Sequence, residues 1–184
     1  MNILFPVSFA VIAYIEGVLP FLMLLAAVLL HEAGHIAAVA ASGGGIRRID
    51  IEPLGARIVP YGLMSHRADA YSALAGAAFN VIAFAVSSAV FSVWGGLYAL
   101  FFALVNLMLA VVNLFPIRGL DGYTALYSLV ADRYGADCAD KVCKKASAVG
   151  TALFFLLSAA AVWLSGFNPG VAAMTAAVNL SKKD

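Results

Sequence analysis

Long apolar stretches dominate the chain, and short polar or glycine-rich segments separate them. A helix needs about 20 predominantly apolar residues to cross a hydrocarbon core of roughly 30 Å. Several of the stretches reach that length, so the pattern predicts about four to six transmembrane helices. The predicted helices cover residues 3–15, 20–41, 68–93, 97–115, 122–134 and 146–165.

Residues 46–64 depart from this pattern, because apolar and polar residues alternate there. Alternation with a period of two is typical of a β-strand, and Pro53 and Gly55 favour a turn at its middle. An open sheet edge cannot face lipid. We therefore expect a small β-hairpin at the membrane surface or beside a cavity, between the second and third spans. Residues 132–145 are expected to form a polar link before the last span.

The composition agrees with a membrane protein, since 64% of the 184 residues are hydrophobic and 11% are charged. Soluble proteins average about 45–50% apolar and about 25% charged residues. The expected fold is an all-α polytopic membrane protein, with residues 1–184 as a single membrane-embedded domain and no separate soluble domain. A formal net charge of +1 gives no reason to expect nucleic acid as a partner.

Basic residues gather in segments 43–69 and 116–145, whereas the turns at 16–19 and 94–96 contain none. Lys and Arg are enriched in cytoplasmic loops. We therefore expect an integral, multi-pass membrane protein with its charged loops in the cytoplasm. The compactness of the chain favours a prokaryotic cell membrane.

The sequence His-Glu-Ala-Gly-His at residues 31–35 lies inside an apolar stretch. His31 and His35 project from one face of a helix and can share one metal ion. Glu32 is turned by about 100° from His31, which suits a carboxylate that takes a proton from water and passes it to a leaving amine. A buried ionisable group costs about 3 kcal/mol in a membrane unless it is paired or ligated. A metal site therefore explains this group better than a chance match or buried hydrogen bonding.

Catalytic zinc sites usually have three protein ligands, so a third is expected beside the two histidines. Asp121 is the best carboxylate for this place, because Gly119 and Gly122 permit a break that turns it inward. Glu16 is expected nearer the membrane surface. The alternative role of Asp121 is to cap the helix that follows it. His66 is expected to be a solvated residue in a polar link.

The two motifs together resemble the site-2 proteases, the zinc metalloproteases of regulated intramembrane proteolysis. That family combines HExxH in one membrane helix with a distant, membrane-embedded NxxPxxxLDG. Here the second motif reads Asn-Leu-Phe-Pro-Ile-Arg-Gly-Leu-Asp-Gly at residues 113–122. The resemblance extends from the second predicted span to about residue 130. The compact chain without a PDZ insertion looks most like the subgroup that contains the stage IV sporulation processing protease.

The resemblance implies an activity and a set of site residues. It implies one Zn²⁺ per chain, held by His31, His35 and Asp121, with Glu32 as the general base and acid. The implied reaction is hydrolysis of peptide bonds in or near the transmembrane segments of membrane proteins. The implied partners are a transmembrane protein substrate, a regulatory membrane protein and the lipid bilayer.

The resemblance also points to two asparagines in apolar surroundings. Asn80 ends a Gly-x-x-x-Asn pattern at residues 76–80, although Val81 stands where the family usually has proline, and Asn113 opens the second motif. Either amide can bind the substrate backbone or a tetrahedral oxyanion. An interhelical hydrogen bond explains each of them equally well.

Two other functions fit fewer of these residues. A metal carrier would spread polar residues along a path, whereas the polar groups here gather at one depth. A non-catalytic relative that binds transmembrane partners would need neither Glu32 nor a complete ligand set. The sequence therefore favours a hydrolase.

Overall fold

The structure of the chain is a computed structural model that describes residues 17–164, apart from residues 44, 53–54 and 62–64. The first predicted helix, residues 3–15, lies outside the described residues. The described part contains helices and two strands. They are α2 (Val18–Ala41), β1 (Gly45–Glu52), β2 (Gly55–Tyr61), α3 (His66–Trp94), α4 (Leu97–Asn113), α5 (Asp121–Tyr134) and α6 (Ala136–Leu164).

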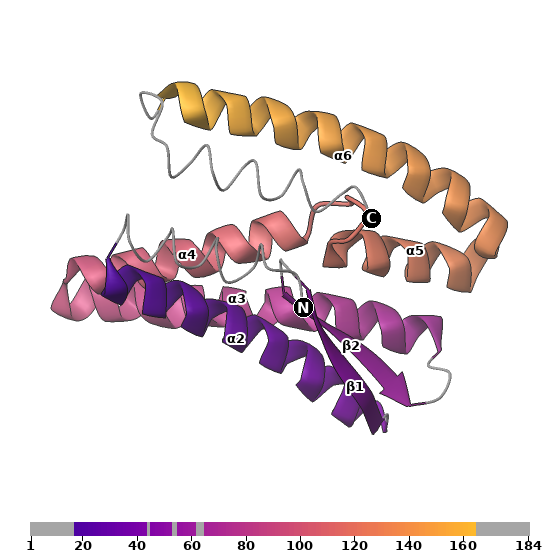
Figure 1. The fold of residues 1–184 in the computed structure, drawn as a ribbon, viewed down its shortest axis with the longest axis horizontal. Helices are drawn as coiled ribbons and strands as arrows, with labels where there is room; N and C mark the ends of the chain where they lie inside the picture. The colour runs from indigo at the N-terminus through magenta and orange to yellow at the C-terminus, as the bar shows by residue number, and fades with distance from the viewer. Residues whose placement is uncertain (1–16, 44, 53–54, 62–64, 165–184) are drawn as a thin grey trace.

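Helix α3 is at the centre of the helical arrangement. It packs against α2, α4 and α5, and α6 packs along α5 (Figure 1). The ends of α3 follow from its flanking residues. The Ser65 hydroxyl accepts a hydrogen bond from the backbone N–H of Ala68, which caps the N-terminus. Gly95 and Gly96 follow its last turn with positive φ angles and reverse the chain into α4.

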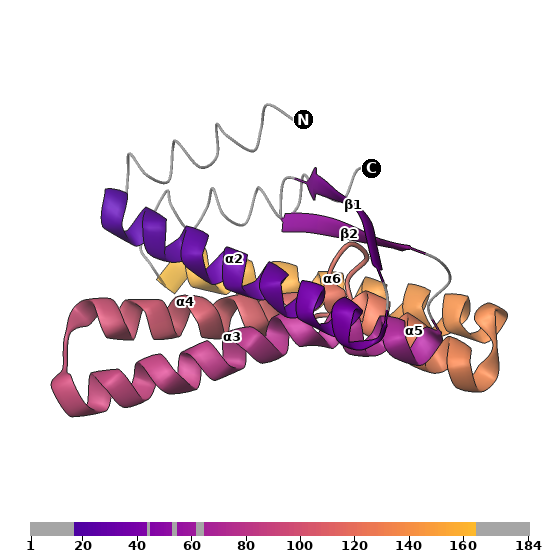
Figure 2. The ribbon, with the colours of Figure 1, turned by 90° about the horizontal axis from the view of Figure 1, so that it is seen from below.

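Strands β1 and β2 form a two-stranded antiparallel sheet, in which Ile49 lies opposite Ile58 and Glu52 lies opposite Gly55. A β-bulge between Ile46 and Arg48 shifts the register at the other end. Both strands contact α2, and they lie outside the layer that α2, α3 and α4 form (Figure 2).

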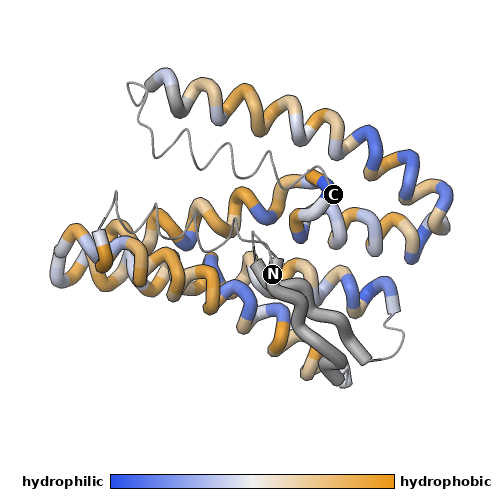
Figure 3. The backbone as a smooth tube through the Cα atoms, in the orientation of Figure 1, coloured by the Kyte–Doolittle hydropathy of each residue, from blue (hydrophilic) through white to orange (hydrophobic). Residues whose placement is uncertain are grey.

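The expected fold class needs correction in its number of membrane spans. Within the described residues, three helices are long and apolar enough to cross a membrane: α2, α3 and residues Ala136–Ala160 of α6. Figure 3 shows the apolar character along α2, α4 and much of α3 and α6. Helix α4 is apolar but has only 17 residues. The described chain thus has three candidate spans instead of about four to six, and the two strands lie between the first and second of them.

The length of α4 has a local cause. The helix ends at Asn113, two residues before the predicted end. Pro116 has no backbone N–H, and it disfavours helical backbone at the residue before it. The chain therefore leaves the helix at Leu114, and the apolar residues 114–115 belong to the following loop.

Residues 132–145, which were expected to be a polar link, are almost entirely helical. Helix α5 continues to Tyr134, Gly135 turns the chain with a φ of 83°, and α6 begins at Ala136. Ala139 and Cys143 are fully buried, one turn apart on the same face of α6. This apolar stripe packs α6 against α5, while the charged residues between the two remain on the exposed side.

The loop between α4 and α5 is held by a small apolar cluster. Ile117 and Leu120 of the loop are buried together with Phe154 of α6. The backbone N–H of Arg118 donates to the Ser147 hydroxyl of α6 across 3.2 Å. Helix α6 therefore fixes the loop that leads directly to Asp121.

Candidate metal centre

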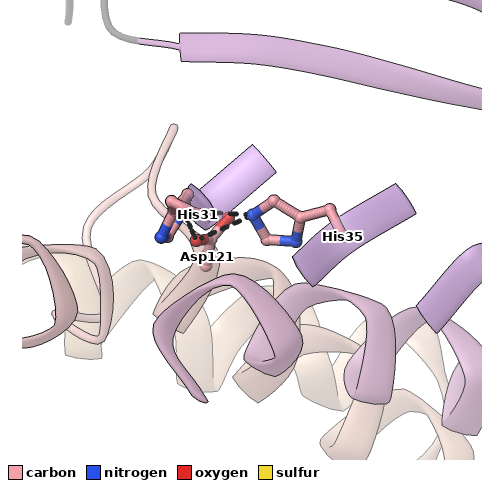
Figure 4. Close-up of side chains that lie close together, drawn as sticks. All are labelled: His31, His35 and Asp121. Atoms are coloured by element: carbon pink, nitrogen blue, oxygen red, sulfur yellow. Dashed lines mark hydrogen bonds and ion pairs between the residues drawn. The ribbon is translucent and has the colours of Figure 1, made fainter. Parts of the chain in front are cut away.

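Three side chains from two helices point at one another (Figure 4). His31 and His35 come from α2, and Asp121 is the first residue of α5. The Asp121 Oδ2 atom lies 2.9 Å from His31 Nε2 and 3.3 Å from His35 Nε2. The two Nε2 atoms are 3.1 Å apart. The three ligand atoms therefore form a nearly equilateral triangle.

The hydrogen bonds of the two Nδ1 atoms indicate which nitrogen of each imidazole carries the proton. His35 Nδ1 donates to the backbone carbonyl of Ser72 across 2.7 Å, and His31 Nδ1 donates to Asn80 Oδ1 across 2.6 Å. Each partner atom is an acceptor, so each neutral imidazole carries its proton on Nδ1. Both Nε2 atoms consequently face the centre with a free lone pair.

The charges and distances in this triangle fit a metal ion. Two unprotonated nitrogens and a carboxylate oxygen repel one another unless a proton or a metal ion lies between them. A tetrahedral ion bound at about 2.0–2.2 Å separates its ligand atoms by roughly 3.3–3.6 Å, so these atoms need to move apart by only a few tenths of an ångström to hold one. The side chains of His31, His35 and Asp121 are 7%, 12% and 22% exposed, so the centre is largely buried but open beside the carboxylate.

Gly76 lets α3 pass directly beneath the two imidazoles. A Cβ atom at this position would lie 2.5 Å from His35 Nε2 and 2.8 Å from His31 Nε2. Gly34 has a matching role on α2, since a Cβ there would lie 2.6 Å from the carbonyl oxygen of Ala75. Both glycines belong to motifs found in the sequence, and the structure shows that they permit the close approach of α2 and α3.

Asp121 reaches the histidines because of the turn that precedes it. The N-cap of α5 is Leu120, which is extended and buried, and no side chain caps this helix. The Asp121 carboxylate contacts the imidazoles instead, so the capping role that the sequence left open is not the one observed. A Cβ on Gly122 would collide with the Leu114 carbonyl, so only glycine allows the loop to fold back this tightly.

Among solved structures, a site-2 protease from Methanocaldococcus jannaschii matches this chain with a TM-score of 0.67. The match covers 97% of this chain and 83% of that one, at 23% sequence identity. This chain has a site-2 protease fold. The match does not extend to the predicted subgroup of the stage IV sporulation processing protease. A scan of protein-family models and a search of curated proteins each found no match.

Within the site-2 protease fold, the remaining predicted residues occupy different places. Glu32 follows His31 on α2 and is half-buried. Asn80 is fully buried on α3 and contacts His31 directly. Asn113, the last residue of α4, donates to the carbonyl of Leu109 in its own helix across 3.0 Å. Asn80 and Asn113, for which the sequence allowed the same two roles, therefore have different surroundings.

One residue beside this centre was missed by the sequence analysis. Asn106 of α4 is 0% exposed, and its Oδ1 accepts a hydrogen bond of 2.7 Å from Asn80 Nδ2. The available signal was a single amide within the apolar residues 99–112. A buried amide in a membrane helix needs partners on neighbouring helices. The sequence does not show which helices those are.

Proposed function

We propose that this chain is a zinc metalloprotease of the site-2 family that cleaves peptide bonds in or near transmembrane segments of membrane proteins. One observation carries the proposal: the Nε2 lone pairs of His31 and His35, on the helix that also bears Glu32, converge on a largely buried point with a carboxylate oxygen of Asp121 from α5. The site-2 protease fold supports the same conclusion.

The proposed ligands are His31 Nε2, His35 Nε2 and Asp121 Oδ2, which would hold one Zn²⁺ per chain. Two histidines and a carboxylate are a usual donor set for a catalytic zinc ion, and a fourth position stays open. When bound, zinc acts as a Lewis acid on the scissile carbonyl and makes water a nucleophile at neutral pH.

Glu32 is the proposed general base and acid. Its carboxylate takes the proton of the attacking water and then gives that proton to the amine that leaves. Its position next to His31 on α2 turns it by about 100° from that ligand, which keeps it beside the ion rather than on it.

Asn113 is the asparagine that we propose to bind the substrate or a tetrahedral oxyanion. It is half-buried at the end of α4, where the loop to Asp121 begins. The oxygen of the Asn80 amide accepts from His31, and its nitrogen donates to the carbonyl of Ala27 and to Asn106. These contacts favour the interhelical role for Asn80 rather than contact with substrate.

The charged residues support the proposed orientation in a prokaryotic cell membrane. The polar starts of α3 and α6 lie at the same end of the molecule as α5 (Figure 3). At this end Arg67 Nε donates to Asp132 Oδ2 across 2.9 Å, which joins α3 to α5. We propose that this end faces the cytoplasm. The proposed partners are the lipid bilayer, a transmembrane protein substrate and a regulatory membrane protein.

Elemental analysis of the detergent-purified protein tests the metal site. We expect about one zinc per chain, as in other structural and catalytic zinc centres. His31→Ala and Asp121→Ala should lose it, because each removes one of three ligands. His66→Ala is the matched control, since His66 is exposed at the start of α3 and should leave zinc unchanged. A wild-type protein without zinc, after purification without chelators, would overturn the proposal.

The catalytic part of the proposal is tested with Glu32→Gln in the same preparation. This variant should keep zinc and lose cleavage of co-expressed single-span membrane proteins that carry a tag at each end. A metal carrier would show no cleavage in either form. Cleavage by Glu32→Gln at the wild-type rate would contradict the assigned role of Glu32.

A further inference from the structure

A chain of buried hydrogen bonds links α4 through α3 to the metal centre on α2. Asn106 and Asn80 are both 0% exposed. Asn106 Nδ2 donates to the carbonyl of Phe102 across 2.8 Å, and Asn106 Oδ1 accepts from Asn80 Nδ2 across 2.7 Å. Asn80 Oδ1 then accepts from His31 Nδ1 across 2.6 Å. Every step joins a donor to an acceptor in one consistent direction.

The direction of these hydrogen bonds fixes the orientation of the Asn80 amide. Its nitrogen has two hydrogens, and both are directed at acceptors, the carbonyl of Ala27 at 3.1 Å and the oxygen of Asn106. The oxygen end must therefore face His31. A reversed amide would bring its oxygen against two other oxygens, which is unfavourable in a buried, apolar environment.

Asn106 in turn has its own orientation set by its helix. Its nitrogen donates to the carbonyl four residues earlier, so its oxygen is the end that faces Asn80. If Asn80 reversed, its NH₂ group would meet His31 Nδ1. That nitrogen would then have to accept, and the proton of a neutral imidazole would move to Nε2, the atom that faces Asp121.

We propose that Asn106 is a positioning residue that keeps the proton of His31 on Nδ1, through Asn80, and so keeps Nε2 free to bind metal. This inference concerns the centre described under the proposed function and rests on it. The hydrogen bonds of Asn106 go to Phe102 and Asn80 and not to a ligand atom. Its effect passes through one intermediate side chain on a different helix.

Two variants of Asn106 separate this role from simple packing. Asn106→Leu keeps the size of the side chain but removes its acceptor. Asn106→Asp keeps an oxygen acceptor for Asn80, and in its protonated form it can also donate to Phe102. Ser92→Ala is the matched control, because Ser92 also donates a side-chain hydrogen bond to a carbonyl of its own helix, that of Ala89, but is exposed. Its metal affinity should equal that of the wild type.

The first measurement is nitrogen NMR of metal-free, histidine-labelled protein in detergent, at a pH where imidazole is neutral. His31→Gln identifies the His31 signals. The wild type and Asn106→Asp should show the Nδ1–H form of His31, whereas Asn106→Leu should show a mixture with the Nε2–H form. An unchanged Nδ1–H form in Asn106→Leu would overturn the inference.

The second measurement is zinc affinity by competition with a chromophoric chelator, together with the absorption spectrum of the Co²⁺ form. Asn106→Leu should bind zinc about tenfold more weakly, at the lower end of the effect of outer-shell partners. In an Asn80→Leu background, Asn106→Leu should cause no further loss, since its route to His31 is already broken. If the losses of zinc affinity in the two single variants add up in the double variant, the inference is wrong.

The two measurements distinguish this inference from the proposed function. The NMR result needs no metal, so it decides the role of Asn106 even if the protein binds no zinc. Absence of zinc from the wild type would refute the protease proposal alone. If Asn106→Asp does not show the Nδ1–H form of His31, only the proposed role of Asn106 is refuted.

Discussion

At the scale of single residues, Gly76 is the glycine that directly adjoins the proposed ligand atoms of the candidate metal centre. The position where its Cβ would be lies within 2.8 Å of Nε2 atoms that we propose as ligands. Backbone and imidazole are both held by the packing of α2 on α3, so neither can move away freely. The missing side chain is therefore a condition for the site and not only for helix packing.

Gly76→Ala is expected to lose zinc, because its methyl group would push both imidazoles away from Asp121. The measurement is zinc content together with helix content by circular dichroism, which should stay near that of the wild type. Ala78→Ser is the matched control, since it adds one heavy atom to the same helix at an exposed position. Full zinc content in Gly76→Ala would show that the two helices can separate without loss of the centre.

The sequence allowed part of this centre to be predicted. A spacing of four residues predicts that His31 and His35 share a face, and their Nε2 atoms indeed lie 3.1 Å apart. Asn106 could not be found in this way, because its role depends on α4 crossing near α3 at the level of Asn80. A helix pattern gives the face of a residue, but not the partner that this face meets.

At the scale of elements, α6 controls the loop that carries Asp121 to the histidines. Phe154 of α6 is buried with Ile117 and Leu120, and its ring lies edge-on to Phe115 with centroids 6.1 Å apart. These contacts come from a helix that provides no ligand itself. The position of Asp121 therefore depends on the packing of α6.

Phe154→Ala is expected to weaken zinc binding about tenfold, since it loosens the support of one ligand. Chelator competition measures the affinity, and proteolysis of the loop reports its mobility. The neighbouring variant Phe155→Ala is the control, because Phe155 is 48% exposed and is not part of the loop cluster. Equal zinc affinities of the two variants would mean that the loop holds its shape without α6.

The elements that the sequence analysis misjudged share a physical reason. Charged residues in segment 132–145 indicated a link, yet a helix can carry many charges if one narrow stripe is apolar. Ala139 and Cys143 are that stripe, and two small residues are a weak signal without knowledge of α5. Within the described residues the span count differs because helix length is not visible in hydrophobicity: α4 ends at Asn113 ahead of Pro116 with 17 residues, and α5 has only 14.

At the scale of the whole molecule, polar and apolar ends are separated along the long axis. Helix α3 has 29 residues and is roughly 43 Å long, which exceeds the hydrocarbon core. Its start carries Arg67 and Asp69, whereas its end at Trp94 meets two glycines and no charge. The two ends of α3 are therefore expected on opposite sides of the membrane.

Labelling with a membrane-impermeant maleimide tests this orientation. In a Cys143→Ala background, Cys138 near the start of α6 should react in inverted vesicles and not in intact cells. With both native cysteines replaced by alanine, Trp94→Cys should show the reverse, since Trp94 is 79% exposed at the other end. Reaction of both cysteines from one side would contradict the orientation.

Because α4 is short, the thickness of the bilayer is expected to affect how water reaches the site. Its 17 residues span roughly 26 Å, a few Å less than the hydrocarbon core, and the chain then turns into the loop that ends at Asp121. Local thinning of the bilayer is one response to so short an apolar helix, and it would bring the lipid boundary level with this turn. Such hydrophobic mismatch would bring the aqueous boundary closer to the metal centre, so membrane thickness would set how far water travels to reach the bond that is cut.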